Sequence, residues 1–167
     1  MALTLNKNYQ SLLIFPAAVV GLAFLVWVVM HNDAIVNLFS PAASVTEVVL
    51  GETHIPVEVV SSAKDVEHGL SERENLPAGQ GMLFVFGNDG NWGIWMKDMR
   101  FSIDIIWADS AGRVVTVLPS VSPETYPKVF YPSLPARYVL EVPAGFAAAH
   151  HFSEGMQMVL SNAGTAK

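Results

Sequence analysis

The sequence contains no cysteine. This absence excludes disulfide bonds, a thiolate nucleophile and the common cysteine-based structural zinc sites. Basic residues are scarce as well: 9 Lys and Arg stand singly along the chain against 15 Asp and Glu, and the net charge is −6. A protein that binds nucleic acid through its phosphates needs clustered positive charge. We therefore expect no nucleic-acid partner.

The sequence also lacks the common catalytic and metal-binding motifs. It has no Gly-x-Ser-x-Gly elbow, P-loop or dinucleotide-binding fingerprint. Its histidines have no His-x-x-x-His or His-Glu-x-x-His spacing, and His150 and His151 are adjacent, so on a helix they point in different directions. We expect no cofactor and no metal site, and we assign the histidines to solvated or capping positions.

A long uncharged segment stands near the N-terminus. Residues 8–32 hold no Lys, Arg, Asp or Glu, and within them residues 11–30 form an apolar run. As a helix, about 20 residues span about 30 Å, which matches the hydrocarbon core of a bilayer. A buried helix of a soluble protein would have amphipathic flanks, and these flanks show no such pattern. We predict a transmembrane anchor over residues 11–30, with the lipid bilayer as its partner.

The few charges around this segment suggest its orientation. Lys7 precedes the segment and Asp33 follows it, so the positive-inside tendency places residues 1–10 in the cytoplasm. Residues 31–44 would form a tether, and the remainder would lie in the periplasm or outside. The predicted localisation is thus a single-pass inner-membrane protein with its N-terminus inside.

A cleaved signal peptide is the alternative interpretation of the N-terminus. Ala42 and Ala43 are small residues of the kind found at cleavage sites. However, the apolar run is longer than a signal h-region, and the small residues lie farther beyond it than usual. We therefore favour an uncleaved anchor, with export after cleavage as the alternative.

With 167 residues, 51% of them apolar, the chain is long enough for one domain with a real core. We predict a β-rich α+β domain over residues 45–161, followed by a tail at 162–167. It should be a compact six- to seven-stranded sheet, barrel-like or a two-layer mixed sheet, with one or two short helices. Alternating or β-branched segments predict strands at 45–50, 55–60, 82–86, 103–107, 114–118, 138–142 and 156–160.

Turn-forming and capping residues divide these strands. Ser62 and Gly69 are typical cap residues and predict a helix over residues 63–68. Residues 87–91 are a dense cluster of Gly, Asn and Asp that predicts a turn. Residues 119–135 hold five prolines, which we expect to exclude strand pairing and to give an ordered surface loop. A second short helix is expected near residues 143–151.

Several sequence blocks occur in an order that matches a known family. Over residues 45–160 the chain resembles the widespread bacterial and archaeal domain of unknown function 192. The resemblance implies a compact β-rich fold with small helices, often exported or membrane-tethered, and no agreed activity. Members usually have an asparagine where this chain has Asp98. The matching blocks are Val57-Glu-Val, residues 68–76, residues 81–86, Trp95-Met-Lys-Asp98, Ile103-Asp-Ile105, Gly112-Arg-Val and residues 135–145.

Residues 93–105 place charged side chains among aromatic and aliphatic ones. On one continuous strand, Lys97 would share an apolar face with Trp95 and Phe101. Burial of an unpaired ammonium is costly, and such a strand would be unusually long. We therefore predict a break between Lys97 and Arg100. The break puts Lys97 at a strand end, where a solvent-accessible site can form.

Asp104 and Glu141 are acidic residues inside apolar strands. Asp104 shares a strand face with Ile106, so its carboxylate should be half buried and should need a donor. A structural ion pair is the simplest interpretation. Glu141 could cap a turn or meet Arg137, or it could form a carboxylate pair with Asp104, as glycoside hydrolases require. The candidate donors for Asp104 are Arg73, Lys97, Arg100 and Arg137.

Most of the aromatic residues should pack in the core and loops. An exposed Trp92 or Trp95 beside Lys97 would instead offer a groove for a sugar ring or an extended peptide. We predict a membrane-tethered, extracytoplasmic binding or accessory module for an envelope glycan, peptide or protein. Its candidate ligand-binding residues are Arg73, Trp95, Lys97, Asp98, Asp104 and Glu141.

Two other functions remain open at this point. The first is a cell-envelope hydrolase that uses Asp104 and Glu141 as its carboxylates. The second is a protein–protein interaction domain that docks through the apolar loop at residues 119–135.

Overall fold

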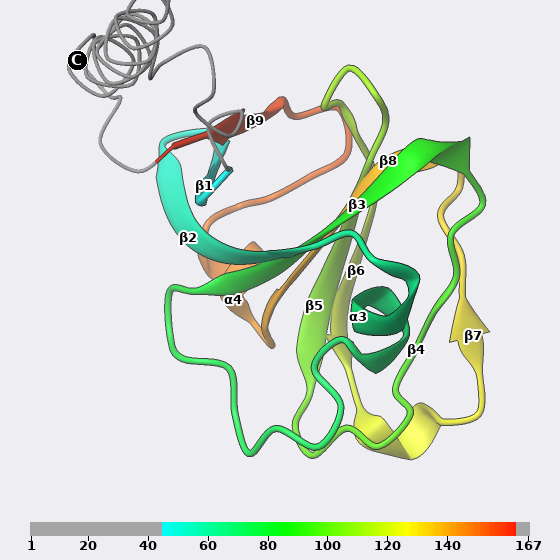
Figure 1. The fold of residues 1–167 in the computed structure, drawn as a ribbon. Coiled ribbons are helices and arrows are strands. Elements are labelled where there is room, and N and C mark those ends of the chain that lie inside the picture. The colour runs from blue at the N-terminus through cyan, green and yellow to red at the C-terminus, as the bar shows by residue number, and fades with distance from the viewer. Residues whose placement is uncertain (1–44, 163–167) are drawn as a thin grey trace, which may run out of the picture. The chain divides into compact units, whose positions relative to one another are not determined.

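The computed structural model describes residues 45–162 (Figure 1). Seven strands form one curled half-barrel sheet in the order β6-β5-β8-β3-β2-β1-β9. The strands are β1 (Glu47–Leu50), β2 (Thr53–Val60), β3 (Gly81–Gly90), β5 (Ile103–Ala108), β6 (Val114–Val121), β8 (Ala136–Pro143) and β9 (Met158–Ser161).

The remaining elements are short. β4 (Ile94–Trp95) and β7 (Val129–Phe130) form a separate two-stranded sheet. The helices are α3 (Ala63–His68), α4 (Phe146–Ala149) and a 3-10 helix, η2 (Pro123–Thr125). The predicted β-rich fold with short helices is thus confirmed. The predicted anchor at residues 11–30 lies outside the described residues, and within residues 45–162 no helix is long and apolar enough to cross a bilayer.

β8 is an interior strand of the sheet. It pairs antiparallel with β5 on one side and with β3 on the other. A central strand is buried on both faces, which explains the nearly continuous apolar run of Val139, Leu140 and Val142. Glu141 is the acidic interruption of this run.

The pairing of β2 with β3 is parallel, unlike the other pairings of this sheet. A parallel pair needs a crossover connection, and α3 lies within it. The backbone N–H of Asp65 donates to Ser62 Oγ at 3.2 Å, and Gly69 ends the helix with φ +51°. These two caps confirm the helix predicted over residues 63–68.

Two hydrophobic clusters fill the two faces of the sheet. α3 and the β4–β7 pair cover the first face, where Leu70, Phe84 and Trp107 belong to one cluster. α4 covers part of the second face, where Ala147 packs in a cluster with Leu140. Successive side chains of one strand point to opposite faces of the sheet, so they belong alternately to the two clusters.

The two outer strands of the sheet meet at one end. Arg113 and Gln157 form an isolated antiparallel bridge, and the N–H of Met158 donates to the carbonyl of Gly112 at 2.7 Å. Gly112 has φ +79°, and a Cβ there would lie 2.3 Å from the Met158 oxygen. Only glycine allows the two chain segments to come this close. The contact covers part of the otherwise open edges of the two outer strands.

Two of the sequence predictions are wrong. β6 continues through Pro119 to Val121, and β7 also lies in the proline-rich segment. β6 is an outer strand with a register shift in this region, so the missing N–H of Pro119 is tolerated. The expected turn at residues 87–91 is instead the irregular end of β3, where the register shifts between Val85 and Gly90.

The predicted break in residues 93–105 is confirmed. β4 ends at Trp95 and β5 begins at Ile103. Between them the N–H of Met99 donates to the carbonyl of Met96, and Asp98 adopts φ +54°. Aspartate and asparagine enter this left-handed region more readily than most residues. This backbone requirement suits Asp98, and it would also suit the asparagine that the family resemblance implies at this position.

Candidate functional site

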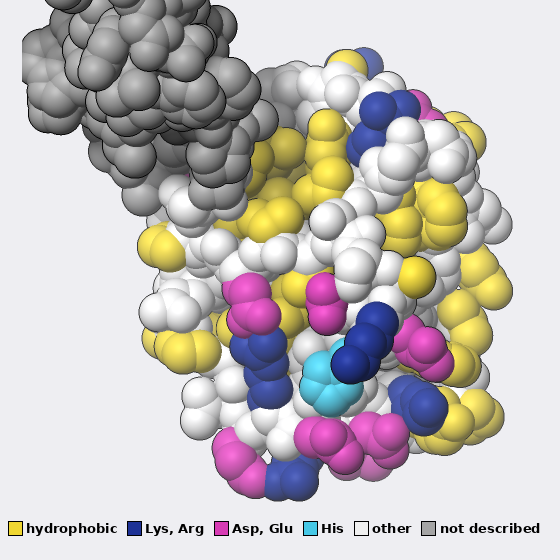
Figure 2. Space-filling model, viewed as in Figure 1, with side chains coloured by type: hydrophobic (Ala, Val, Ile, Leu, Met, Phe, Trp, Pro, Cys, Tyr) yellow, Lys and Arg dark blue, Asp and Glu magenta, His cyan; other side chains and the backbone are white. Residues whose placement is uncertain are grey.

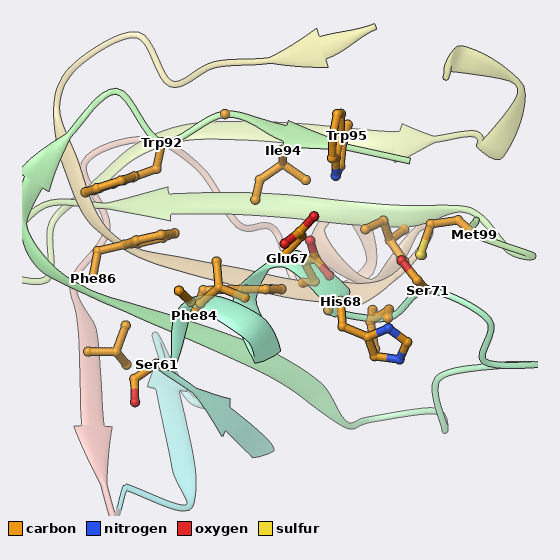
Figure 3. A pocket seen from close by; sticks show the side chains of 18 of the residues that line it. Ser61, Glu67, His68, Ser71, Phe84, Phe86, Trp92, Ile94, Trp95 and Met99 are labelled. Atoms are coloured by element: carbon orange, nitrogen blue, oxygen red, sulfur yellow. The ribbon is translucent and has the colours of Figure 1, made fainter. Parts of the chain in front are cut away.

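A pocket of about 490 Å³ opens beside α3 (Figure 3). Small-molecule sites typically enclose about 300–1,000 Å³, so the pocket is large enough for an organic ligand. Its walls are mainly apolar and aromatic. They include Val66 and Leu70 from the α3 region, Phe84 and Phe86 from β3, and Trp92, Ile94, Trp95, Met99 and Ile103 from the chain around β4 and β5.

The aromatic walls are held in place by contacts outside the pocket. The rings of Phe86 and Trp92 stack with centroids 4.2 Å apart and nearly parallel planes, as Figure 3 shows at one end of the pocket. Trp92 Nε1 donates to the carbonyl of Asn88 at 3.1 Å. Trp107 Nε1, from the core, donates to the carbonyl of Trp92 at 2.9 Å. This end of the pocket is therefore preorganised.

Trp95 forms part of the opposite end of the pocket, near Met99 (Figure 3). Its side chain is 42% exposed, and its ring meets Tyr126 edge-on at a centroid distance of 6.1 Å. An exposed tryptophan fixed by a second aromatic ring is suited to contact with an apolar or cationic group.

Glu141 is the buried acidic side chain of the pocket. Its neighbours across the sheet are Met82 on β3 and Ile105 on β5, and only 4% of its surface is exposed. Within residues 45–162 its carboxyl group has no hydrogen-bond or ion-pair partner. Burial raises the pKa of Glu141 to about 8, so the acid is mainly protonated at neutral pH.

Lys97 and Asp98 line a second recess, of about 290 Å³, beside the pocket. The two hollows share Glu67, His68 and Ser71. The ammonium of Lys97 lies 5.7 Å from the Trp95 ring centroid, within the range of a cation–π contact. Figure 2 shows acidic and basic side chains interspersed over this face of the domain. The recess is therefore a mixed-charge rim of the pocket.

Arg73 lines neither hollow. Its guanidinium donates two hydrogen bonds to the Glu58 carboxylate, at 2.7 and 2.8 Å. The hydrogen bond from Arg73 lowers the pKa of Glu58. Arg73 therefore fixes the loop after α3 to β2, and Glu58 occupies two of its N–H donors.

Asp104 is fully buried and is satisfied by backbone groups. It accepts hydrogen bonds from the N–H groups of Ser120 at 2.7 Å, Gly145 at 3.0 Å and Ala147 at 2.7 Å. None of the four predicted cationic donors reaches it: Lys97 lies over Trp95, Arg73 pairs with Glu58, Arg100 with Glu74 and Arg137 with Asp89. The expected ion pair is absent, and Asp104 instead fastens the end of β6 and the start of α4 to β5.

Asp104 and Glu141 do not form a carboxylate pair. Across the β5–β8 ladder, Asp104 faces Val142 and Ile105 faces Glu141. Directly opposed residues share a face, and consecutive residues alternate. The two carboxyl groups therefore lie on opposite faces of the sheet. The arrangement does not provide the two flanking acids of a glycoside hydrolase.

The comparisons with known proteins agree with this fold. A model of the uncharacterised family DUF192 matches residues 45–160, most of the chain. The chain belongs to the DUF192 family. No curated protein matches the sequence.

Two solved structures share the fold of this DUF192 domain. A protein described as a proposed transcription regulator from Sinorhizobium meliloti has a TM-score of 0.65 and 24% identity, over 72% of this chain and 98% of that one. A protein of unknown function from Novosphingobium aromaticivorans has a TM-score of 0.64 and 22% identity, over 72% and 92%. At these identities the likeness shows the fold alone.

The DUF192 fold thus separates the predicted site residues into three places. Trp95 and Glu141 line the pocket, Lys97 and Asp98 line the adjoining recess, and Arg73 and Asp104 lie elsewhere. The candidate list also lacked several residues that line the pocket, among them Phe84, Phe86, Trp92, Glu67 and His68. Three of these residues lie in the sequence blocks 68–76 and 81–86, which match the family. That match was the sequence signal that could have identified them.

Proposed function

We propose that this protein is a membrane-tethered, extracytoplasmic module that binds a small, largely apolar molecule in the pocket beside α3. The observation that carries the proposal is the pocket itself, about 490 Å³ of space with aromatic walls. A protein interior normally closes such space, because each unfilled wall loses dispersion contacts. Here Phe86 and Trp92 stack on each other in the pocket wall, and hydrogen bonds hold Trp92 in place.

The tether rests on the apolar run at residues 11–30 and the single Lys7 before it. With the N-terminus in the cytoplasm, the pocket would face the periplasm or the outside. Membrane fractions washed with alkaline carbonate should retain the full chain, and protease added to spheroplasts should cleave the domain. A mature N-terminus near residue 43 would instead identify a cleaved signal peptide.

Ligand binding can be tested by filling the pocket. The change Val66→Phe adds an aromatic ring to a partly buried wall residue. Its matched control is Val59→Phe, at a position 37% exposed on β2 and outside the pocket lining. Small apolar molecules that raise the melting temperature of the full chain in detergent should lose this effect in Val66→Phe and keep it in Val59→Phe. Stabilisation by the same molecules in both variants would contradict the proposed site.

A second candidate function is protein–protein interaction through the segment at residues 119–135. Tyr126, Tyr131 and Leu134 are 46%, 56% and 61% exposed there, and aromatic side chains are enriched at interfaces. Replacement of Leu134 by serine should abolish recovery of a crosslinked partner if this surface docks one. The same replacement should leave small-molecule stabilisation unchanged, so the two functions can be separated.

A further inference from the structure

We infer that the ligand of this pocket carries one ammonium group on an apolar body, and that the carboxylate of Glu141 binds this group. The inference rests on the proposed binding function and specifies its ligand class. Three observations carry it: the unpartnered carboxyl group of Glu141, the aromatic walls, and the distribution of charge around the pocket.

The first observation is a contrast between two buried acids. Asp104 and Glu141 are the buried charged residues within residues 45–162. Asp104 accepts three backbone hydrogen bonds, whereas Glu141 has no partner in the described part of the chain. No side-chain oxygen of the described residues is both fully buried and without a partner, so the unpartnered oxygens of Glu141 reach the open space of the pocket. A ligand that enters the pocket would reach Glu141 and supply the missing partner.

The second observation is the kind of surface around this carboxyl group. Phe84, Phe86, Trp92 and Trp95 all line the same pocket. The faces of aromatic rings carry negative electrostatic potential and attract cations, most strongly at tryptophan. Lys97 already makes such a contact with Trp95 on the outer side. A ligand ammonium would therefore meet both a carboxylate and aromatic faces.

The third observation is the sign of the charges that line the pocket. Its titratable lining residues are Glu67, His68 and Glu141, and no Lys or Arg of the described chain is among them. An anionic ligand would meet two carboxyl groups in the lining, and the ammonium of Lys97 lies in the adjoining recess. The lining thus favours a cation over an anion.

Binding by this route should release a proton. Burial holds the proton on Glu141 in the empty pocket. The ammonium keeps its own protons and displaces the Glu141 proton to solvent, which leaves a carboxylate hydrogen-bonded to an ammonium. From α3, the titratable groups facing the pocket are Glu67 and His68, both exposed. The sheet neighbours Met82 and Ile105 do not titrate.

The test compares three probes that share a phenylalkyl body: phenethylamine, phenethyl alcohol and hydrocinnamate. Each is titrated into the full chain in detergent near neutral pH by isothermal calorimetry. The amine should bind at least about tenfold more tightly than the alcohol, because a charge-assisted hydrogen bond is added. Its binding should also release protons, measured from the dependence of the heat on the buffer's ionisation enthalpy. Hydrocinnamate should bind most weakly.

Two variants locate the effect. Glu141→Gln keeps the size of the side chain but removes its charge, so the amine should bind within about twofold of the alcohol and release no proton. Glu67→Gln, at the other acid of the same pocket, tests whether that carboxylate binds the amine instead. Glu154→Gln, at an exposed acid outside the pocket lining, is the control and should keep the preference for the amine. Comparison of the variants with the same probe in the same detergent cancels partition of that probe into micelles.

The outcomes separate this inference from the proposed function. Binding of the alcohol with no preference for the amine, or a preference that survives Glu141→Gln, overturns the ligand class but leaves the pocket as a binding site. Loss of the preference in Glu67→Gln alone also overturns the role of Glu141. Failure of all three probes to bind contradicts the pocket itself, and the inference with it.

Discussion

Asp104 and Glu141 are diagonal neighbours across the β5–β8 ladder, yet their side chains point to opposite faces of the sheet. Asp104 accepts hydrogen bonds from three backbone N–H groups, whereas Glu141 lines the pocket and has no hydrogen-bond partner among the described residues. The first carboxylate fastens loops to the sheet. The carboxyl group of Glu141 is left available to a ligand, and its burial disfavours the charged form.

Asp104→Ala should strongly destabilise the domain. The substitution leaves the buried N–H groups of Ser120, Gly145 and Ala147 without their acceptor, and each lost partner costs about 1–3 kcal/mol. We expect the free energy of unfolding in urea to fall by several kcal/mol. Asp104→Asn keeps one acceptor oxygen and should lose less. Glu52→Ala, at an exposed turn residue, is the control, and equal stability of the Asp104→Ala variant and this control would contradict the assigned role.

Glu141→Gln should stabilise the domain at alkaline pH. Below the ordinary pKa of 4.5, Glu141 is protonated in both the folded and the unfolded chain. Between 4.5 and about 8 the unfolded chain loses this proton while the folded chain retains it. The wild-type free energy of unfolding therefore falls as pH rises through this window.

Glutamine removes this dependence because it does not titrate. The variant's advantage should reach a few kcal/mol above the folded-state pKa and should disappear at acidic pH. Urea unfolding across the pH range measures the difference between the two curves. A constant difference at all pH values would mean that Glu141 does not titrate abnormally.

The structural features that could be predicted from the sequence depend on residues close together in the chain. Ser62 and Gly69 cap the helix between them through contacts within a few residues. The residues that determine where this helix begins and ends are therefore all close together in the sequence. The break after Trp95 was likewise predictable, because burial of Lys97 in a continuous strand would be costly. The extension of β6 through Pro119 was not predictable, because it depends on the strand's outer place in the sheet.

The candidate site needed information that a single strand does not carry. The donors to Asp104 come from residues 16 to 43 positions away, and they are backbone groups that any residue type offers. The environment of Glu141 is set by the registers of β3 and β5 beside β8. Strand parity alone therefore predicted a half-buried Asp104, but it left the environment of Glu141 open and did not show that the two acids face different sides.

Gly93→Ala should disturb the wall formed by β4 and β7. A Cβ at Gly93 would lie 2.6 Å from both Tyr131 Cε1 and Val129 Cγ1. We expect a loss of about 1–3 kcal/mol in the free energy of unfolding, as for other overpacked positions. Gly87→Ala, also in the pocket lining but with no atom within 4 Å of the added Cβ, is the matched control. Equal effects of the two changes in denaturation experiments would contradict the close packing at Gly93.

Asp98→Gly should stabilise the turn between β4 and β5. Asp98 has φ +54°, a conformation that costs most L-residues about 1 kcal/mol and glycine little. Asp98→Asn should be nearly neutral, and Asp98→Ala should lower the melting temperature. Glu72, with φ +64°, gives an independent check, since Glu72→Gly should also stabilise. A lower melting temperature for both glycine variants would contradict this account.

The pairing of β1 with β9 makes the domain a candidate for rewiring of its connectivity. The N–H of Thr46 donates to the carbonyl of Ser161 at 3.1 Å, so the first and last strands are hydrogen-bonded neighbours. A linker of a few residues could join them, and new termini could be opened at the exposed turn around Ser110. Such a circular permutant would retain the pocket without residues 1–44 and 163–167.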